Sequence, residues 1–374
     1  MKAKFRLSDI NWAVIFPVVA LMATSVLVIY RIHGLEQAAS QVKWMAFSAV
    51  AFLLFVSIDY RLITRYALFI YGLSILSLVL VLFTPPINGA HSWFLFGGMS
   101  LQPSEFAKVA LIVLLAAYLP FRDFYKSMPG LVPPLLLTLL PFSLVIVQPD
   151  LGTALIFLPV FVVVMLVAGV KVKHMLYLLL ITLLLSPLMY MMLEEHQKKR
   201  IHAFINPGMY KKSVNLHLEQ ARIAIGAGGL TGYDPLEEDT EPHLVFLRYA
   251  STDYVFAVIG EQFGFLGTVA VLLLYALLFY ALYLMLVSVR DPFGRMLVAG
   301  AFAAIAAQML IHTGGNLDLI PFTGVPLPFV SAGGSSLMAF SIMIALVINV
   351  GMRRKLVFGK DKSVADDKKA AATP

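Results

Sequence analysis

Charged side chains make up only 13% of this chain, so those at the borders of apolar runs are the first candidates for chemistry. Asp253, in the sequence Thr252-Asp253-Tyr254, stands directly before the apolar run 255–288. A carboxylate at such a border can act as a general base toward a hydroxyl group. From the residues alone the favoured prediction is a helix N-cap, a common role for aspartate. Glu261, about two helical turns further on, is either a second carboxylate of the site or a polar contact within a helix bundle.

Glu105 and Lys108 stand three residues apart at the start of the apolar run 105–120. This spacing places both side chains on one face of a helix, where they can form an ion pair. Ionisable side chains within or beside hydrocarbon are costly, and each is a functional candidate by default. The pair therefore either braces helix packing or contacts a substrate. Ser104, directly after Pro103, is predicted to be the N-cap of this helix.

Asp150 lies in the short turn that joins the apolar runs 131–148 and 152–170. The favoured prediction is a cap on the helix that follows. The alternative is a carboxylate that faces a cavity or a metal ion. No metal site is predicted elsewhere, because the sequence has no cysteine and its histidines show no ligand spacing.

Arg200 and Arg222 lie in the polar stretch 194–253, which also holds a glycine cluster at 226–232. Arginine pairs strongly with phosphate oxygens, so both are candidates for binding a phosphorylated substrate, or else for anchoring the stretch at lipid headgroups. The backbone N–H groups of the glycine cluster could also hold a phosphate, although such clusters usually mark turns.

Residues 321–336 read PFTGVPLPFVSAGGSS, a segment without a charged residue between two apolar runs. Its three prolines and its Gly-Gly pair exclude a continuous helix. Non-helical backbone beside hydrocarbon persists only where protein buries it or where it lines a cavity. The segment is therefore predicted to form the wall of a polar cavity in a membrane protein.

The composition supports this class, since 60% of the residues are hydrophobic and the mean hydropathy is +0.86. The net charge of +7 does not indicate nucleic-acid binding, because the basic residues fall where a membrane topology requires them. We expect an all-α integral membrane protein, a polytopic bundle of about ten transmembrane helices. The predicted spans are 11–30, 42–58, 64–83, 105–120, 131–148, 152–170, 174–193, 255–288, 297–312 and 332–352.

Lysine and arginine occur in every second connection and are absent from the connections 84–104, 149–151 and 313–331. The positive-inside rule then places both termini in the cytoplasm and these three connections outside. The stretch 194–253 becomes one large extracytoplasmic loop between helices seven and eight. Residues 1–354 are predicted to form one transmembrane domain, followed by a disordered cytoplasmic tail at 355–374.

Several blocks, in order along residues 10–354, resemble the SEDS family (shape, elongation, division and sporulation), most closely its rod-shape branch. The blocks are Asn88-Gly89-Ala90 with Trp93, QPSE (102–105) with Lys108, QPDLGTA (148–154), His196-Gln197 with Arg200-Ile201, 220–232, 252–261, PFTGVPLPFVS (321–331) and GGSS (333–336). The resemblance implies a peptidoglycan glycosyltransferase that polymerises lipid II on the outer face of the bacterial cytoplasmic (inner) membrane, for elongation and rod shape. It also implies a class B penicillin-binding protein as partner, and no nucleic acid.

In such proteins the aspartate matching Asp253 is regarded as the essential catalytic residue, and the pair matching Glu105 and Lys108 as important. We therefore expect Asp253 to deprotonate the acceptor 4-hydroxyl in an inverting attack, with Lys108 best suited to stabilise the leaving pyrophosphate. A divalent cation (Mg²⁺ or Mn²⁺) could assist the pyrophosphate. The residues expected to bind substrate are Glu105, Lys108, Arg200, Arg222, Thr252, Ser331 and Ser335, and those expected to support the site are Asp150, Glu261, Gly333 and Gly334.

Three positions depart from the family pattern. Ser92 stands where an arginine is frequent, 247–251 replaces a common Leu-Pro-Glu, and Ala332 replaces an aromatic residue. Two other function classes fit the sequence: a lipid II flippase or other transporter, and a non-catalytic scaffold for the penicillin-binding protein. Broken helices suit a transporter, but the polar motifs concentrate on the connections predicted to lie outside.

Overall fold

The computed structural model describes residues 10–87, 89–96, 99–121, 127–191, 193, 195–206, 215–232 and 250–370. Its regular structure is helical apart from one antiparallel hairpin, in which β1 (Phe94–Phe96) pairs with β2 (Met99–Leu101). The α-helices are α1 (Trp12–Ser57), α2 (Tyr60–Arg65), α3 (Ala67–Val81), α4 (Pro103–Tyr118), α5 (Val132–Val147), α6 (Leu151–Ala168), α7 (Val172–Met191), α8 (Glu195–Ile205), α9 (Asn215–Ala227), α10 (Val255–Ser288), α11 (Pro292–Asn316) and α12 (Gly334–Ala370).

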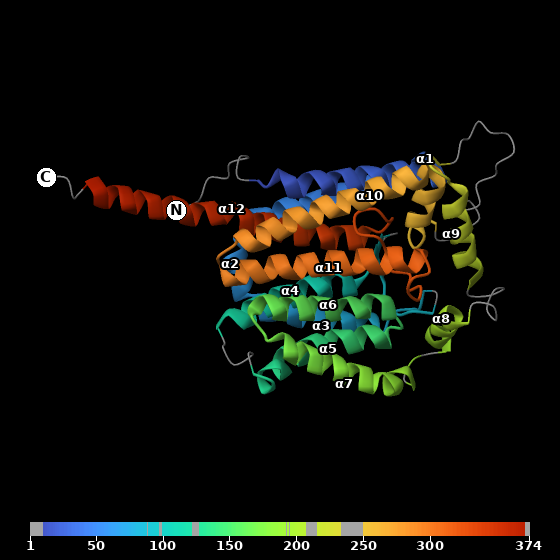
Figure 1. Cartoon of the computed structure of the whole chain (residues 1–374), viewed down its shortest axis with the longest axis horizontal. Helices are drawn as coiled ribbons and strands as arrows, with labels where there is room; N and C mark the ends of the chain where they lie inside the picture. The colour runs from blue at the N-terminus through green and yellow to red at the C-terminus, as the bar shows by residue number, and fades with distance from the viewer. Residues whose placement is uncertain are drawn as a thin grey trace.

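The long helices lie side by side along the long axis of the molecule, which gives the bundle two distinct ends (Figure 1). The helices α8 and α9 lie at one end, beside the connection between α11 and α12. The short helix α2 lies at the opposite end. The two ends of the bundle are therefore formed by different segments of the chain.

The first helix, α1, is a hairpin of two helices joined at Gly34. The backbone of Gly34 has φ 76° and ψ −167°, which is outside the helical region. Gln41 Nε2 donates to Ser25 Oγ at 3.1 Å, although residues this far apart on a straight helix would be separated by about 24 Å. The two predicted spans 11–30 and 42–58 are therefore antiparallel arms of α1.

Each predicted span lies on a helix, so the prediction of a polytopic all-helical membrane protein is confirmed. Within the described residues, six helices are long and apolar enough to cross a membrane, and α3 and part of α7 are shorter apolar helices. The count differs from the predicted ten because α1 contains two spans, and because α3, α4 and the apolar part of α7 are too short to be counted, with α3 and α4 at 15 and 16 residues. How many of the ten cross the membrane stays a prediction.

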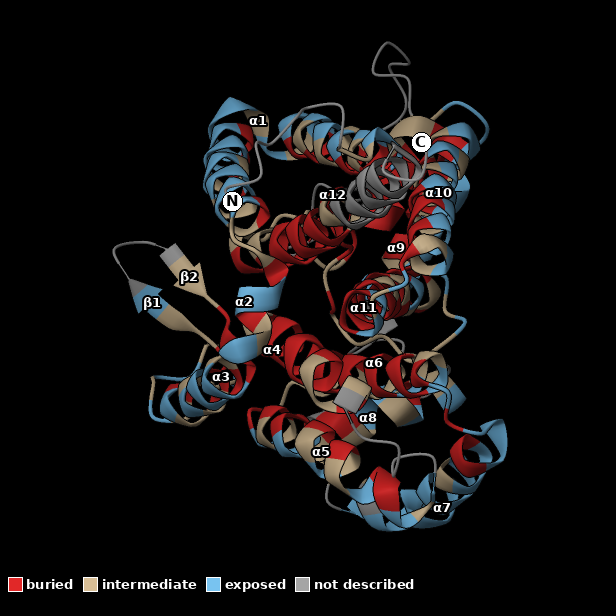
Figure 2. Ribbon diagram, turned by 90° about the vertical axis from the view of Figure 1, so that its left-hand side faces the viewer, coloured by how far each residue is buried: buried red, intermediate tan, exposed pale blue. Residues whose placement is uncertain are grey.

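The centre of the bundle is formed by α4, α11 and α12, which Figure 2 shows largely buried, whereas α7 is exposed along most of its length. Small residues allow the close approach of the central helices. A Cβ added to Gly300 of α11 would lie 2.5 Å from a side-chain carbon of Ile112 in α4. The central helices are thus held in a fixed register, which positions the polar side chains they carry.

Residues 317–333 have no regular helix or strand and fold back over the end of α11. The absence of a helix here was predicted from the prolines and glycines. Val325, Leu327 and Val330 are buried, so the segment is packed against protein as non-helical backbone beside hydrocarbon requires. Its predicted role as the wall of a polar cavity stays a prediction.

The backbone of α12 continues as a helix to Ala370, beyond residue 354 where the predicted disordered tail begins. Lysine and alanine, which are frequent in this stretch, are favourable helix formers. Residues 371–374 lie outside the described part of the chain, as do residues 194, 207–214 and 233–249 of the large loop predicted at 194–253.

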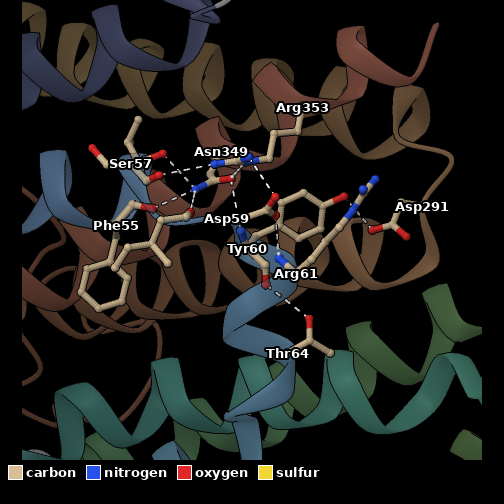
Figure 3. Close-up of polar contacts among 11 residues, drawn as sticks. Phe55, Ser57, Asp59, Tyr60, Arg61, Thr64, Asp291, Asn349 and Arg353 are labelled. Atoms are coloured by element: carbon tan, nitrogen blue, oxygen red, sulfur yellow. Dashed lines mark hydrogen bonds and ion pairs between the residues drawn. The ribbon is translucent and has the colours of Figure 1, made fainter. Parts of the chain in front are cut away.

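A dense polar cluster closes the end of the bundle near α2 (Figure 3). Asn349 Nδ2 donates to the carbonyl oxygens of Phe55, Val56 and Ile58 at the end of α1. We call the residues Asp59, Tyr60, Asp291, Asn349 and Arg353 the Asn349 cluster. Its remaining contacts are Tyr60 N to Asn349 Oδ1 at 3.4 Å, Arg353 Nε to Asn349 Oδ1 at 2.8 Å, Arg353 Nη1 to Asp59 Oδ2 at 2.9 Å and Tyr60 Oη to Asp291 Oδ2 at 3.0 Å.

Candidate active site

Asp253 lies in the turn directly before α10, next to the irregular segment 317–333. A Cβ placed on Gly324 would lie 3.3 Å from Asp253 Oδ2, so the carboxylate packs against a residue without a side chain. The prediction that Asp253 is the N-cap of this helix is wrong. The N-cap of α10 is Tyr254, and no side chain makes a capping hydrogen bond there. The carboxylate is therefore directed toward the segment and away from the helix end.

Burial raises the pKa of Asp253 from 3.8 to about 6. Loss of solvent is the largest cause, and the negative charge of Asp150 acts in the same direction. A hydrogen bond from Thr252 and the positive charge of Arg200 act in the opposite direction. A carboxylate with this pKa is ionised at neutral pH and more basic than an ordinary aspartate, which suits a general base.

Three successive carbonyl groups of the Asp253 turn are held from the other side of the site. Ala332 N donates to the carbonyl of Ser251 at 2.8 Å, and Ser331 Oγ donates to that of Thr252 at 2.6 Å. Asn316 Nδ2 donates to the carbonyl of Asp253 itself at 3.0 Å. Ser331, expected to bind substrate, lies at the site, where its hydroxyl holds the turn; substrate binding stays a prediction.

The hairpin tip of α1 also contacts this turn. His33 Nε2 lies 3.2 Å from Ser251 Oγ, and Arg31 stacks over the ring of Phe263 at 4.6 Å. Gln41 Nε2 lies 3.4 Å from the carbonyl of Ser331 and donates to it. None of these α1 residues was predicted from the sequence.

The structure places both predicted arginines beside the irregular segment. Arg200 Nη1 donates to the carbonyl of Thr323 at 3.1 Å, and its charge acts on Asp253. Arg222 Nη1 pairs with Asp318 Oδ2 at 2.8 Å. Arg200 is exposed and has a neutral partner, so it is the better placed of the two to receive a phosphate group.

Asp150 caps α6 as predicted, since its Oδ1 accepts from Thr153 N at 3.1 Å. Its Oδ2 also accepts from Gln102 Nε2 at 2.8 Å. Gln102, and not Ser104 as predicted, is the N-cap of α4, because Pro103 occupies the first helical position. The turns before α4 and α6 are therefore joined.

Ser335 joins α12 to the hairpin and to the start of α4. Its Oγ accepts from Gln102 N at 3.0 Å and donates to the carbonyl of Ser100 at 3.1 Å. Ser92, at one of the positions that depart from the family, is buried and donates to the carbonyl of Gln148 at 3.1 Å. Both serines fix the backbone of turns at this end of the bundle.

Glu105 and Lys108 form the predicted ion pair, with Lys108 Nζ 2.9 Å from Glu105 Oε1. Both side chains are fully buried. Lys108 Nζ also donates to Gln308 Oε1 at 2.6 Å and lies 5.2 Å from the ring centre of Phe340. The ammonium group is thus enclosed by protein and does not reach the surface.

Of the residues expected to support the site, Gly334 packs closely against a neighbouring helix, whereas Gly333 does not. A Cβ on Gly334 would lie 2.1 Å from the ring of Trp44, whereas none of the atoms near a Cβ on Gly333 is closer than 3.9 Å. Glu261 is buried within α10. Gly228 of the glycine cluster packs so closely on α10 that a Cβ would lie 1.9 Å from the carbonyl of Gly260, so this cluster is used for helix packing.

Among the described residues there is no group of three or more histidine, aspartate or glutamate side chains that could hold a metal ion. The divalent cation considered from the sequence stays a prediction, and no step of the proposed reaction depends on one.

Sequence reasoning missed Gln308, His312 and Asn316, which line one face of α11 next to the site. The available signal was their spacing of four residues within an otherwise apolar helix. His312 had been considered only as a metal ligand.

Known proteins resemble this chain over most of its length. A family model named FtsW/RodA/SpoVE and described as a cell cycle protein matches residues 6–356. The peptidoglycan glycosyltransferase MrdB of Helicobacter pylori (strain J99) is 32% identical over 356 residues, which cover 92% of this chain and 90% of that protein. The peptidoglycan glycosyltransferase RodA of Treponema pallidum is 27% identical, over 93% of this chain and 98% of that protein.

Two solved structures have the same fold. A chain of a peptidoglycan synthase complex, described for its structural coordination of polymerization and crosslinking, superposes with a TM-score of 0.79 at 28% identity, covering 92% of this chain and 98% of that chain. The rod shape determining protein RodA of Thermus thermophilus superposes with a TM-score of 0.69 at 28% identity, covering 92% and 97%. The resemblance inferred from the sequence blocks is confirmed, and the chain belongs to the FtsW/RodA/SpoVE family of membrane proteins.

Proposed function

We propose that this protein is a peptidoglycan glycosyltransferase that polymerises lipid II into glycan strands, with Asp253 as the general base. The observation that carries the proposal is the placement of Asp253, a carboxylate with a raised pKa that packs against Gly324 of the irregular segment and is acted on by the charge of Arg200. The relatives named as peptidoglycan glycosyltransferases support the class of reaction.

In the proposed reaction, Asp253 takes the proton of the 4-hydroxyl of the N-acetylglucosamine of the acceptor lipid II. The hydroxyl oxygen attacks the anomeric carbon of the terminal N-acetylmuramic acid of the growing chain and forms the new glycosidic bond. The bond to the pyrophosphate breaks, and undecaprenyl pyrophosphate leaves with the electron pair. Because the pyrophosphate donor is already activated, a single base is sufficient. The anomeric configuration is inverted because the attack is one displacement.

The leaving pyrophosphate needs positive charge close by. We assign this role to Arg200, because it is exposed and its charge already reaches Asp253. Arg222 can assist once its pair with Asp318 opens. Lys108 was expected to be the best candidate, but its buried contacts with Glu105 and Gln308 favour a structural role.

The proposal extends to the setting of the protein. The site end of the bundle would face the outer side of the cytoplasmic (inner) membrane, with both termini in the cytoplasm, as the distribution of basic residues predicts. The partner would be a class B penicillin-binding protein, which the similarity to a chain of a polymerization and crosslinking complex supports. Elongation and rod shape are the proposed cellular role.

The test is polymerisation of purified lipid II by detergent-solubilised protein, with the cognate class B partner present and blocked by penicillin. We expect wild type to form polymer and Asp253→Asn to lose about 10²- to 10⁴-fold in rate, as expected for loss of a general base. The matched control is Asp59→Asn, the same change at the opposite end of the bundle, which should remain active.

Two outcomes distinguish the other function classes. Lipid II translocation in vesicles by wild type, without polymer in any condition, would support a flippase and reject the proposal. Partner binding by wild type, without polymer or translocation, would support a scaffold. An Asp253→Asn variant with wild-type polymerisation would refute the assignment of the base.

A further inference from the structure

Three polar side chains form a buried row on one face of α11. Gln308, His312 and Asn316 stand four residues apart, and each is at most 3% exposed. Burying polar groups in an apolar helix is costly unless they are hydrogen-bonded. We call these three residues the α11 row and ask what their hydrogen bonds hold.

Two members of the row hold the irregular segment. Gln308 Nε2 donates to the carbonyl of Pro326 at 2.9 Å. His312 Nδ1 lies 2.7 Å from the carbonyl of Val325. Since a carbonyl only accepts, Nδ1 must carry the proton. Val325 follows Gly324 directly, the residue against which the Asp253 carboxylate packs, so these bonds fix the surface beside the base.

The third member holds the base directly. Asn316 Nδ2 donates to the carbonyl of Asp253 at 3.0 Å and to that of His312 at 2.9 Å. The row thus connects a rigid central helix to both sides of the Asp253 carboxylate: its own backbone, and the segment it faces.

The row also carries buried polar atoms that are without a hydrogen-bond partner in the described part of the chain, His312 Nε2 and Asn316 Oδ1. Leaving a buried acceptor unmatched costs free energy. Packing alone would favour apolar side chains here, so the retained hydrogen bonds point to a requirement for positioning.

At its inner end the row meets the buried ion pair, since Gln308 Oε1 accepts from Lys108 Nζ at 2.6 Å. The same amide donates to Pro326. The pair of Glu105 and Lys108 is therefore connected to the irregular segment through one side chain.

We propose that His312 and Asn316 are positioning residues for Asp253, which hold the base in its reactive orientation and do not touch the substrate. This inference rests on the proposed function. Groups locked by a rigid element and its hydrogen bonds keep a productive geometry, and a shift of about 1 Å can cost about 10²-fold in rate.

The first test is the initial rate of lipid II polymerisation by the penicillin-blocked complex, as a function of lipid II concentration. Asn316→Ala should lower kcat by about 10- to 100-fold and change KM by less than about threefold, because the base is displaced while the binding surface remains. The matched control is Thr313→Val, which removes a buried hydroxyl that donates to Met309 within α11 and should leave kcat within about twofold.

The second test uses a conservative rescue at His312. Asparagine places an amide N–H near the position of His312 Nδ1 and removes the unmatched Nε2, whereas leucine removes the donor. We expect His312→Asn to keep the rate within about threefold of wild type, and His312→Leu to lose at least about tenfold. Thermal unfolding of each variant in detergent identifies any loss that follows from instability.

The outcomes separate this inference from the proposed function. If wild type polymerises, Asp253→Asn does not, and both Asn316→Ala and His312→Leu retain wild-type kcat, the positioning role is refuted while the function stands. If Thr313→Val loses kcat as strongly as Asn316→Ala, the row is only structural, and the inference is again refuted. If wild type forms no polymer, the proposed function fails first and the inference with it.

Discussion

Both ends of the bundle carry buried polar residues but use them differently. In the Asn349 cluster, the amide and carboxylate atoms are matched with one another and with the carbonyl groups at the end of α1 (Figure 3). At the Asp253 end, buried polar atoms of Ser104, Glu105 and His312 have no partner within the described residues.

The difference indicates what each end is for. A fully matched polar cluster fixes the packing of helices, and its members act on stability. Unmatched buried groups cost free energy that packing does not return, and they are typical of sites where geometry serves a reaction. We therefore expect changes at the Asn349 cluster to affect stability alone, and changes at the Asp253 end to affect the rate.

The largest effect is expected from Lys108→Met, which leaves the carboxylate of Glu105 buried without its cation. Breaking a buried ion pair from one side costs about 3–5 kcal/mol. The free energy of unfolding should fall by that amount, and polymerisation should fall with it, since Gln308 loses the donor that orients it. Thermal or denaturant unfolding in detergent and the polymerisation rate are the measurements.

The matched double variant Glu105→Leu with Lys108→Met removes both charges. It should be more stable than the single variant, because no unpaired charge remains. Its rate should stay low if the pair acts through Gln308. A double variant that is no more stable than Lys108→Met would contradict the assignment of a coupled buried pair.

A smaller and purely structural effect is expected from Asn349→Leu. The change removes the donor for three carbonyl groups at the end of α1, and buried unmatched carbonyls cost about 1–3 kcal/mol. The unfolding midpoint should fall, while the rate per folded molecule stays within about twofold of wild type. A loss of rate without a loss of stability would break the contrast between the two ends.

Much of the fold follows from the sequence because its signals are local. The run lengths placed every long helix, and the prolines and glycines of 321–336 identified the irregular segment. The hairpin of α1 was foreseen as two spans joined at 31–41, but the sharpness of its reversal was not, since helix continues on both sides of Gly34 where a longer connection was expected.

The site was only partly predictable, because its contacts join residues distant in the chain. Spacing correctly gave the Glu105–Lys108 pair and the Asp150 cap, both of which are local. The burial of Lys108 depends on α11 and α12, which no local pattern specifies. Asn316 acquires its role only through its contact with Asp253, 63 positions away.

The effect most specific to the Asp253 end is the pH dependence of the rate. The base must be ionised, and its pKa is raised to about 6. The rate should therefore be constant above about pH 7 and fall about tenfold per unit below pH 6. We call the fall of the rate below about pH 6 the acidic limb of the pH profile. Asn349→Leu should lower the unfolding midpoint without moving the acidic limb.

The same raised pKa gives a prediction for stability. Because the folded protein holds this proton more tightly than the unfolded chain, whose ordinary value is 3.8, the contribution of Asp253 to the unfolding free energy is present below about pH 4 and is lost as the pH rises through about 6. Asp253→Asn should thus raise the unfolding midpoint relative to wild type at pH 7.5, and less so at pH 4. Equal midpoints at both values would contradict the raised pKa.

Arg200→Gln provides the sharpest comparison. Removing this cation should move the acidic limb to higher pH, because the charge of Arg200 lowers the pKa of Asp253. It should also lower the plateau, since the leaving pyrophosphate loses its partner. The pH at the midpoint of the acidic limb and the rate on the plateau are measured independently. A lower plateau with an unchanged midpoint would support Arg200 as a phosphate ligand and would contradict its effect on the pKa of Asp253.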